Sequence, residues 1–161
     1  MTKETTGIRG RLRWAVRDQY GNVTHEGVNH NIVTNDGDAL IADALAETPA
    51  RTRVDNANGQ IAVGTGFTSA TKTSTINSAS GSPEALDAGY PQLKGSFGAA
   101  DDNVVQYRAT FEAGDLNATG IDEAELSNGT DVLAYAEISP SVNVGASDTL
   151  QIDWEITLLG S

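Results

Sequence analysis

Two glutamates are the residues in this sequence whose type and spacing come nearest to a catalytic pair. Glu123 and Glu125 stand two positions apart in a stretch with strand periodicity, so both carboxylates are expected on one strand face. Paired carboxylates are the acid and base of glycosidases. In an acidic β-protein, however, the same spacing more often belongs to a solvated strand face. We therefore predict a protein that is not an enzyme and has no catalytic residues.

Three other motifs are too incomplete to indicate a metal or a cofactor. His25 and His30 are the only histidines, and without a cysteine or a histidine pair at ligand spacing they are too few for a zinc site. Asp36-Gly37-Asp38 lacks the further ligands of a calcium loop and is better explained by helix capping. Gly64-Thr65-Gly66 matches the first half of the dinucleotide-binding motif G-x-G-x-x-G, but Ser69 stands where the third glycine is required, and no βαβ pattern follows.

The charge of the chain is unevenly distributed. The formal net charge is -12, yet residues 1 to 53 hold 7 basic and 7 acidic groups, whereas residues 54 to 161 hold 3 basic and 15 acidic ones. Such an acidic body repels phosphate backbones, so we expect no nucleic-acid partner. The scarcity of lysine also suits adaptation to high salt, where self-repulsion is screened, although an ordinary acidic protein remains the alternative.

A row of arginines stands out against this acidity. Ile8 to Val16 reads as a long strand whose one face carries Arg9, Arg11 and Arg13, and Arg17 continues the row. One interpretation is a solvated face that pairs with acidic neighbours in the same sheet. The other is a contact strip for an acidic partner, including another copy of this chain, because arginine forms bidentate pairs with carboxylates.

The C-terminal third predicts antiparallel strands most clearly. Val104 to Phe111, Gly120 to Leu126 and Val132 to Ile138 each show strand periodicity, and Asn128-Gly129 is a turn between the last two. We expect Pro140 to end the third of these strands, because proline cannot donate to a central ladder. The final strand has five apolar residues in strict alternation: Leu150, Ile152, Trp154, Ile156 and Leu158.

The preceding part of the chain contains fewer regular elements. Residues 18 to 22 predict a hairpin loop, and Val23 to Val28 a short returning strand. The only expected helix covers about residues 37 to 46, and a brief buried strand follows at residues 61 to 63. Residues 67 to 102 are rich in Ser, Thr, Gly and Ala, and we interpret them as a long loop or an arm that orders against a neighbour.

Length and composition favour one domain over residues 1 to 161. A chain of this size buries about two thirds of its unfolded surface in a single core. It has no cysteine for a disulfide scaffold and no apolar run of membrane-spanning length, and it opens on a polar stretch without a signal-peptide core. The sequence thus predicts an all-β protein with one short helix and no membrane partner. Three Asn-X-Thr sequons, at Asn22, Asn117 and Asn128, leave surface glycosylation open.

An ordered set of these features resembles a known group of proteins. The set is Ile32-Val33-Thr34-Asn35-Asp36-Gly37 before Leu40-Ile41-Ala42-Asp43-Ala44-Leu45, then Ile61-Ala62-Val63-Gly64-Thr65-Gly66, Gly120-Ile121-Asp122-Glu123-Ala124-Glu125-Leu126-Ser127-Asn128, and the strands Val132 to Pro140 and Thr149 to Leu158. Together they resemble the small β-rich virion proteins of tailed viruses, a group that includes capsid decoration, head-accessory and tail-fibre-like proteins. The resemblance implies an antiparallel β-sandwich of jelly-roll type, usually oligomeric, without catalytic residues. The acidic composition suits a virus of a halophilic host.

Two functions follow from this resemblance as expectations. The first is a structural virion protein on the capsid exterior, whose partners are the major capsid protein or other virion proteins and further copies of itself; Arg9, Arg11, Arg13 and Arg17 are its candidate interface. The second is a tail-fibre or baseplate component that recognises a host receptor or glycan. Its candidate contact residues are the loop aromatics Tyr20, Tyr90 and Phe97.

Overall fold

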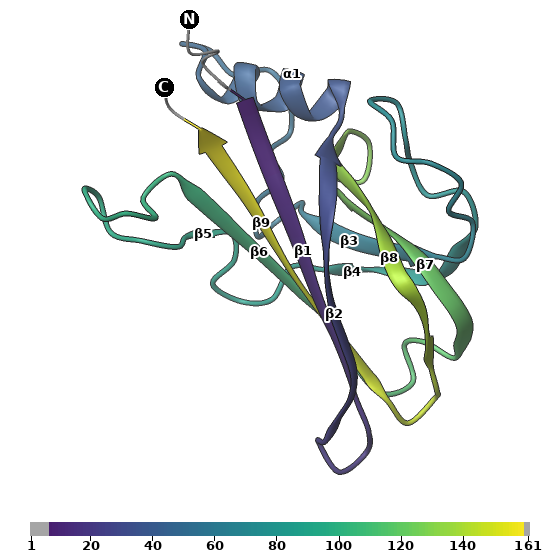
Figure 1. Ribbon diagram of the computed structural model, residues 1–161. Coiled ribbons are helices and arrows are strands. Elements are labelled where there is room, and N and C mark those ends of the chain that lie inside the picture. Colours follow the sequence, from purple (N-terminus) through teal and green to yellow (C-terminus); the bar gives the residue numbers. More distant parts are fainter. Residues whose placement is uncertain (1–6, 160–161) are drawn as a thin grey trace, which may run out of the picture.

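The computed structural model describes residues 7–159. Within this range the chain forms nine strands and one helix (Figure 1). They are β1 (Gly7–Arg17), β2 (Val23–Val33), α1 (Asn35–Ala44), β3 (Gln60–Gly64), β4 (Ala79–Ala85), β5 (Gln92–Leu93), β6 (Val104–Phe111), β7 (Ala118–Ser127), β8 (Val132–Val144) and β9 (Thr149–Leu159).

The nine strands form one antiparallel sheet in the order β4-β3-β7-β8-β2-β1-β9-β6-β5. The sheet curls until Asp87, just after the end strand β4, reaches β6 near the opposite end of the sheet. There the backbone N–H of Asp87 donates to the carbonyl of Arg108, and its carboxylate accepts from the backbone and hydroxyl of Thr110 in β6. The predicted all-β class with one short helix is confirmed. The jelly-roll sandwich that the resemblance implies is not confirmed, because the strands form a single curled sheet.

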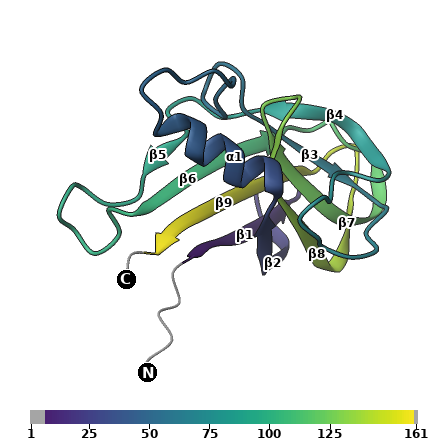
Figure 2. The same cartoon turned by 90° about the horizontal axis from the view of Figure 1, so that it is seen from above.

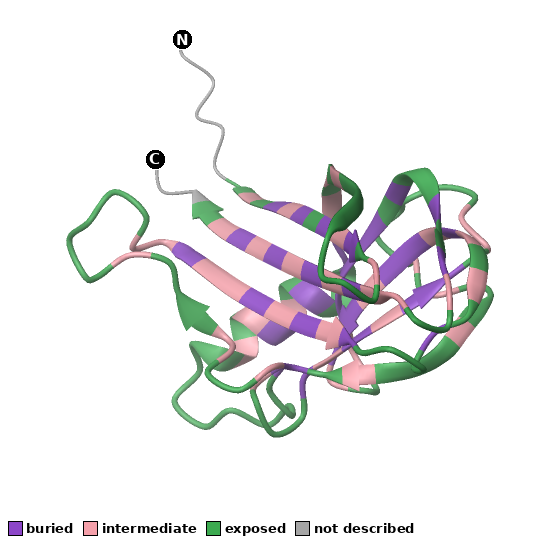
Figure 3. Cartoon of the chain, turned by 90° about the horizontal axis from the view of Figure 1, so that it is seen from below, coloured by how far each residue is buried: buried purple, intermediate pink, exposed green. Residues whose placement is uncertain are grey.

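Alternation of apolar and polar residues places the core on the inner side of the curl. Along β1, β9 and β6, buried residues alternate with partly exposed ones (Figure 3). Leu12, Trp14 and Val16 of β1 pair in register with Trp154, Ile152 and Leu150 of β9. Burial of these side chains, at roughly 1.5–3 kcal/mol each, is the main force that holds this half of the sheet together.

Helix α1 lies across one open end of the curled sheet (Figure 2). It begins two residues before the predicted start, because Thr34 is its N-cap and accepts a 3.0 Å hydrogen bond from the N–H of Gly37. Asp36 and Asp38 lie in the first turn, where carboxylates favour the positive end of the helix dipole. The buried side chain of Leu40 joins the core, so α1 closes this end.

The prediction that Pro140 ends its strand is wrong. Strand β8 continues to Val144. The proline instead coincides with an interruption in the pairing of β8 with β7. The β7–β8 register shifts between the pairs Ile121↔Val142 and Glu123↔Glu137, and β8 pairs with β2 only from Ala134 to Ala136. Because proline has no N–H, Pro140 cannot donate to the ladder with β7, and the β7–β8 register shifts beside it. Past Ala136, β8 also separates from β2.

Strand β2 and the segment 67–102 also differ from expectation. Strand β2 extends five residues past the predicted end at Val28, to Val33. The segment 67–102, expected as a loop or arm, contains the edge strand β4 and the short β5, and their partners in the sheet are β3 and β6.

Candidate interaction surface

The outer face of β1, β9 and β6 carries charged and polar side chains in rows. Arg9, Arg11, Arg13 and Arg17 follow β1, because they alternate with the buried residues of that strand. In the neighbouring rows the register sets Arg11 beside Glu155, and Arg13 and Arg108 on either side of Asp153. The predicted arginine face therefore exists, and acidic residues lie directly beside it.

One arginine of the row is engaged inside the molecule. The Arg11 guanidinium lies 2.6 Å from the carboxylate of Glu155, which also lies 3.3 Å from Nζ of Lys94. Burial raises the pKa of Glu155, but the hydrogen bonds from Arg11 and Lys94 outweigh it, so the pKa falls below its ordinary value. A similar pair joins Arg108 to Asp153 at 2.5 Å. For Arg11, pairing within the sheet is thus the correct interpretation.

The other three arginines form what we call the cationic strip: Arg9, Arg13 and Arg17. Each is exposed, and within residues 7–159 no carboxylate lies within 4 Å of their guanidinium groups. Arg17 donates only to the carbonyl of Gly21, at 3.3 Å. A row of unpaired cations on a protein with a net charge of -12 is the surface best suited to an acidic partner.

The three candidate aromatic residues do not form one patch. Tyr20 is 80% exposed in the β1–β2 loop and Phe97 is 99% exposed in the β5–β6 loop. These loops lie at opposite ends of the sheet (Figure 1). The β1–β2 loop follows the end of β1, which pairs with the start of β9, whereas the β5–β6 loop precedes the start of β6, which pairs with the end of β9. Tyr90 is half-buried against the core, with the Arg108 guanidinium 5.0 Å from its ring centroid.

Glu123, the first member of the candidate acid and base pair, is completely buried and anchors a loop. Its carboxylate accepts hydrogen bonds from the backbone N–H groups of Gly66, Asn77 and Ser78, at 2.9 to 3.1 Å, and from the Tyr135 hydroxyl at 2.5 Å. Five donor contacts occupy its oxygens, so the carboxylate is inaccessible to a substrate. The interpretation of a solvated strand face is therefore wrong for Glu123. The sequence signal that could have indicated its burial is the apolar Ile121 on the same strand face.

Two neighbours of Glu123 hold the same loop. Glu125 accepts from the hydroxyl of Thr75, at 2.5 Å, and from the N–H of Ile76, at 2.9 Å. Asp122 accepts from the N–H of Phe67 at 3.0 Å. We name Asp122, Glu123 and Glu125 the carboxylate clamp, because together they fasten residues 66 to 78 onto β7. The geometry therefore assigns these acids a structural role.

The histidines lie apart from each other on β2. His25 is exposed and its Nδ1 lies 3.2 Å from the hydroxyl of Thr24, while His30 lines a shallow groove with Arg9 and Lys94. Among residues 7–159 no three His, Cys, Asp or Glu side chains are grouped to hold a metal ion. The glycines of Gly64-Thr65-Gly66 pack against Ser78 and the carboxylate clamp. In the same range no helix is both long and apolar enough to span a membrane.

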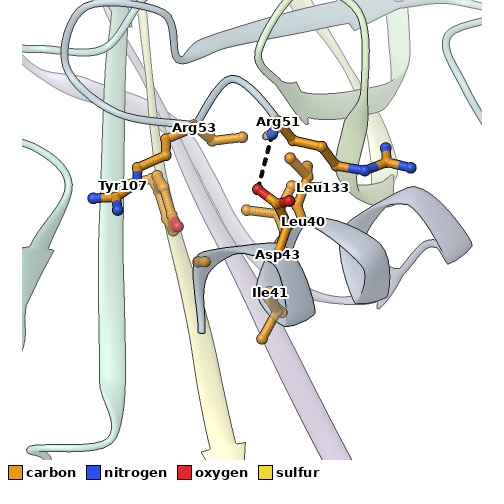
Figure 4. A pocket seen from close by; sticks show the side chains of 9 residues that line it. Leu40, Ile41, Asp43, Arg51, Arg53, Tyr107 and Leu133 are labelled. Atoms are coloured by element: carbon orange, nitrogen blue, oxygen red, sulfur yellow. Dashed lines mark hydrogen bonds between the residues drawn. The ribbon is translucent and has the colours of Figure 1, made fainter. Parts of the chain in front are cut away.

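A small pocket of about 170 Å³ opens between α1 and the sheet (Figure 4). Its apolar wall includes Leu40, Leu133 and Tyr107, and burial raises the pKa of Tyr107 to about 12. At the rim, Asp43 accepts hydrogen bonds from the backbone N–H groups of Ala50 and Arg51, which lower its pKa. The Asp43 carboxylate thus fastens the loop after α1.

In comparisons with known proteins, no family model, curated protein or solved structure matches this chain.

Proposed function

We propose that this protein is a structural virion protein of a tailed virus, located on the capsid exterior, where it binds the shell and neighbouring copies of itself. The resemblance of the sequence to small virion proteins supplies the class. The partners we propose are the major capsid protein, or another virion protein, and further copies of this chain.

The observation that carries the proposal is the cationic strip. Arg9, Arg13 and Arg17 project from a sheet that is held rigid on its other side by a packed core, so their spacing is fixed before binding. The backbone positions of the three arginines are thus set in advance, and each planar guanidinium matches the geometry of a carboxylate. The acidic remainder of the molecule, with 15 acidic and 3 basic groups in residues 54 to 161, supplies such carboxylates on a neighbouring copy.

The proposed mechanism is static binding. Each exposed ion pair contributes little alone, about 0.2–1 kcal/mol, so attachment depends on several pairs together and on the apolar contacts beside them. Such an interface weakens as salt rises, because salt screens exposed charges. Complementary charge also guides a copy to its site and disfavours wrong orientations.

Co-sedimentation with purified particles tests the proposal. We expect the wild-type protein to sediment with particles stripped of it, and the triple variant Arg9→Glu, Arg13→Glu, Arg17→Glu to lose at least tenfold in affinity. Arg53→Glu is the matched control, because Arg53 is exposed and lies near α1, away from the strip. Equal binding of the triple variant would remove the strip from the interface, and no binding of wild type would reject the virion role.

A second function is favoured by the two exposed loop aromatics. Tyr20 and Phe97 are the most exposed aromatic residues of the described chain, and aromatic side chains stack on sugar rings in glycan sites. This alternative makes the protein a tail-fibre or baseplate component that recognises a host receptor or glycan. Glycan-array binding that is lost in Tyr20→Ala or Phe97→Ala, and retained in Tyr90→Ala, would favour it over the capsid role.

A further inference from the structure

We propose that the free edge of β2 receives an extended acidic segment of another protein, which adds a strand to the sheet. By the β2 edge we mean the side of residues 23–28 that faces away from β1. The inference rests on the proposed function for the identity of the partner, a virion protein, but its physical basis is the geometry of the edge alone.

The β2 edge has no strand partner in the described part of the chain. Strand β1 pairs with β2 from Gly10↔Asn31 to Arg17↔Val23, whereas β8 pairs only with Asn31, Ile32 and Val33. Beyond that point the β1–β2 hairpin projects away from β8 (Figure 1). Residues 23–26 and Val28 are exposed, so the edge is open to solvent. An unpaired ladder of this kind is a template for strand addition.

The register identifies which backbone groups are free. The N–H of Thr34 donates to the carbonyl of Leu133 in β8, so it points away from β1. Backbone groups alternate in direction along a strand, and the β1–β2 register is unbroken from Asn31 to His25. The N–H and C=O groups of Val28 and Glu26 therefore point toward the open edge, and the intervening residues bond to β1.

The structure also shows why β8 leaves this edge vacant. The Asn29 side chain takes the place of a ladder pair: its Oδ1 accepts from the N–H of Ser139 and its Nδ2 donates to the Ser139 carbonyl, both at 3.3 Å. The same Oδ1 accepts from Nε1 of Trp14 at 3.0 Å, which fixes its orientation. The paired residues of β2 and β8 end at Asn31↔Ala136, so no regular β2–β8 ladder forms beyond this bridge.

The charges beside the β2 edge select an acidic segment. Arg13 and Arg17 of the cationic strip line a shallow groove of about 620 Å³ on the outer face, together with Val28 and the acids Glu26 and Asp153. Asp153 is paired with Arg108, so the two arginines outnumber the one remaining acid, Glu26. Arg13 of β1 is the cross-strand neighbour of Val28 in β2. Only β2 would therefore separate an added strand from the strand that carries this guanidinium. Carboxylates on alternate residues of that strand would face the arginines, while Val28, 54% exposed, offers apolar contact.

A titration of isotope-labelled protein with a short blocked peptide that alternates aspartate and valine tests this inference without particles. By NMR at low salt, we expect the amide resonances of Glu26 and Val28 to shift on saturation. A peptide with lysine in place of each aspartate is the charge control, and we expect it to bind at least tenfold more weakly.

Two pairs of variants separate the backbone contribution from the charge contribution. Val28→Pro removes an outward N–H and should abolish binding, whereas Val28→Thr keeps the N–H and should preserve it. Arg13→Glu should weaken binding at least tenfold without touching the backbone, and Arg53→Glu should leave it unchanged. Chemical shifts confirm that each variant is folded.

The inference would be overturned by the absence of peptide binding, by equal binding of the lysine peptide, or by undiminished binding to folded Val28→Pro. Shifts of Glu26 and Val28 that depend on protein concentration without peptide would also overturn it, since a second copy would then occupy the edge. Failure here leaves the particle co-sedimentation result unaffected, and failure of co-sedimentation leaves the peptide result standing.

Discussion

The hydroxyl of Tyr135 donates a 2.5 Å hydrogen bond to Oε2 of Glu123, and both side chains are completely buried. Three backbone N–H groups, from Gly66, Asn77 and Ser78, complete the surroundings of this carboxylate. Desolvation, followed by the hydrogen bond to Glu123, raises the pKa of Tyr135, so the tyrosine remains a donor. A carboxylate whose spacing suggests catalysis is therefore an internal support for a loop.

We expect Glu123→Gln to lower the free energy of unfolding by about 2–4 kcal/mol, because the four donors lose a charged acceptor and the amide nitrogen, at the position of Oε2, cannot accept from the Tyr135 hydroxyl. Urea denaturation measures this loss. Glu125→Gln is the matched control: its carboxylate is more exposed and holds two donors, so about 1 kcal/mol is expected. Equal losses in the two variants would contradict the special role of Glu123.

The Arg11–Glu155 pair predicts a stability difference that disappears in acid. The pKa of Glu155 in the folded protein lies below its ordinary value of 4.5, so its contribution is present above pH 4.5 and is lost as the pH falls through the folded-state pKa. We expect Arg11→Met to cost about 0.5–1 kcal/mol at pH 7 and less below pH 4. Arg9→Met, which removes an unpaired arginine, should show no such pH dependence. If the loss in free energy of unfolding caused by Arg11→Met were the same at pH 7 and below pH 4, the ion pair would not be its cause.

Tyr107 predicts a corresponding effect at alkaline pH. Its pKa is raised by burial from 10.0 to about 12, so the unfolded chain loses this proton first and stability falls as the pH rises from 10 to about 12. We expect Tyr107→Phe to match wild type at pH 8 and to be more stable by up to about 2–3 kcal/mol near pH 12. Chemical denaturation at the two pH values provides the comparison. Parallel loss of stability in both proteins would show that Tyr107 is not the responsible group.

The alternating strands were predictable because burial on one face leaves a period of two in the sequence. Strand β6 has the predicted bounds, and β9 extends the predicted strand by one residue. Strand β4, with the sequence Ala-Ser-Gly-Ser-Pro-Glu-Ala, has no such period and is mostly exposed. It is a strand because β3 offers it a partner edge, so tertiary pairing overrides the propensity of its residues.

The candidate site was predictable in part for a similar reason. The arginine row follows from periodicity along β1, but which of its members are paired depends on the register against Glu155 and Asp153, which the sequence of one strand does not contain. The vacant β2 edge depends on where β8 separates, and that is decided by the contact between Asn29 and Ser139, 110 positions apart.

The charge imbalance predicts that salt stabilises this protein. Mutual repulsion within a chain of net charge -12 weakens as the screening length falls from about 10 Å at 0.1 M salt to about 3 Å at 1 M. We expect the midpoint of thermal unfolding to rise by several degrees between 0.1 and 2 M KCl. In Glu47→Lys with Glu137→Lys, which replaces two exposed acids, the rise should be smaller. A midpoint that is flat or falls with salt would reject the halophilic interpretation.

The central claim, that this protein binds the exterior of a viral capsid through the outer face of β1 and the adjacent β2 edge, is tested most directly by cryo-electron microscopy of the assembly with which the native protein purifies. The account predicts density for the curled sheet on the outer surface of the shell, with Arg13 and Arg17 facing acidic residues of a neighbour. Density on the tail, or a shell contact made through β4 or α1 with the arginines facing solvent, would contradict it.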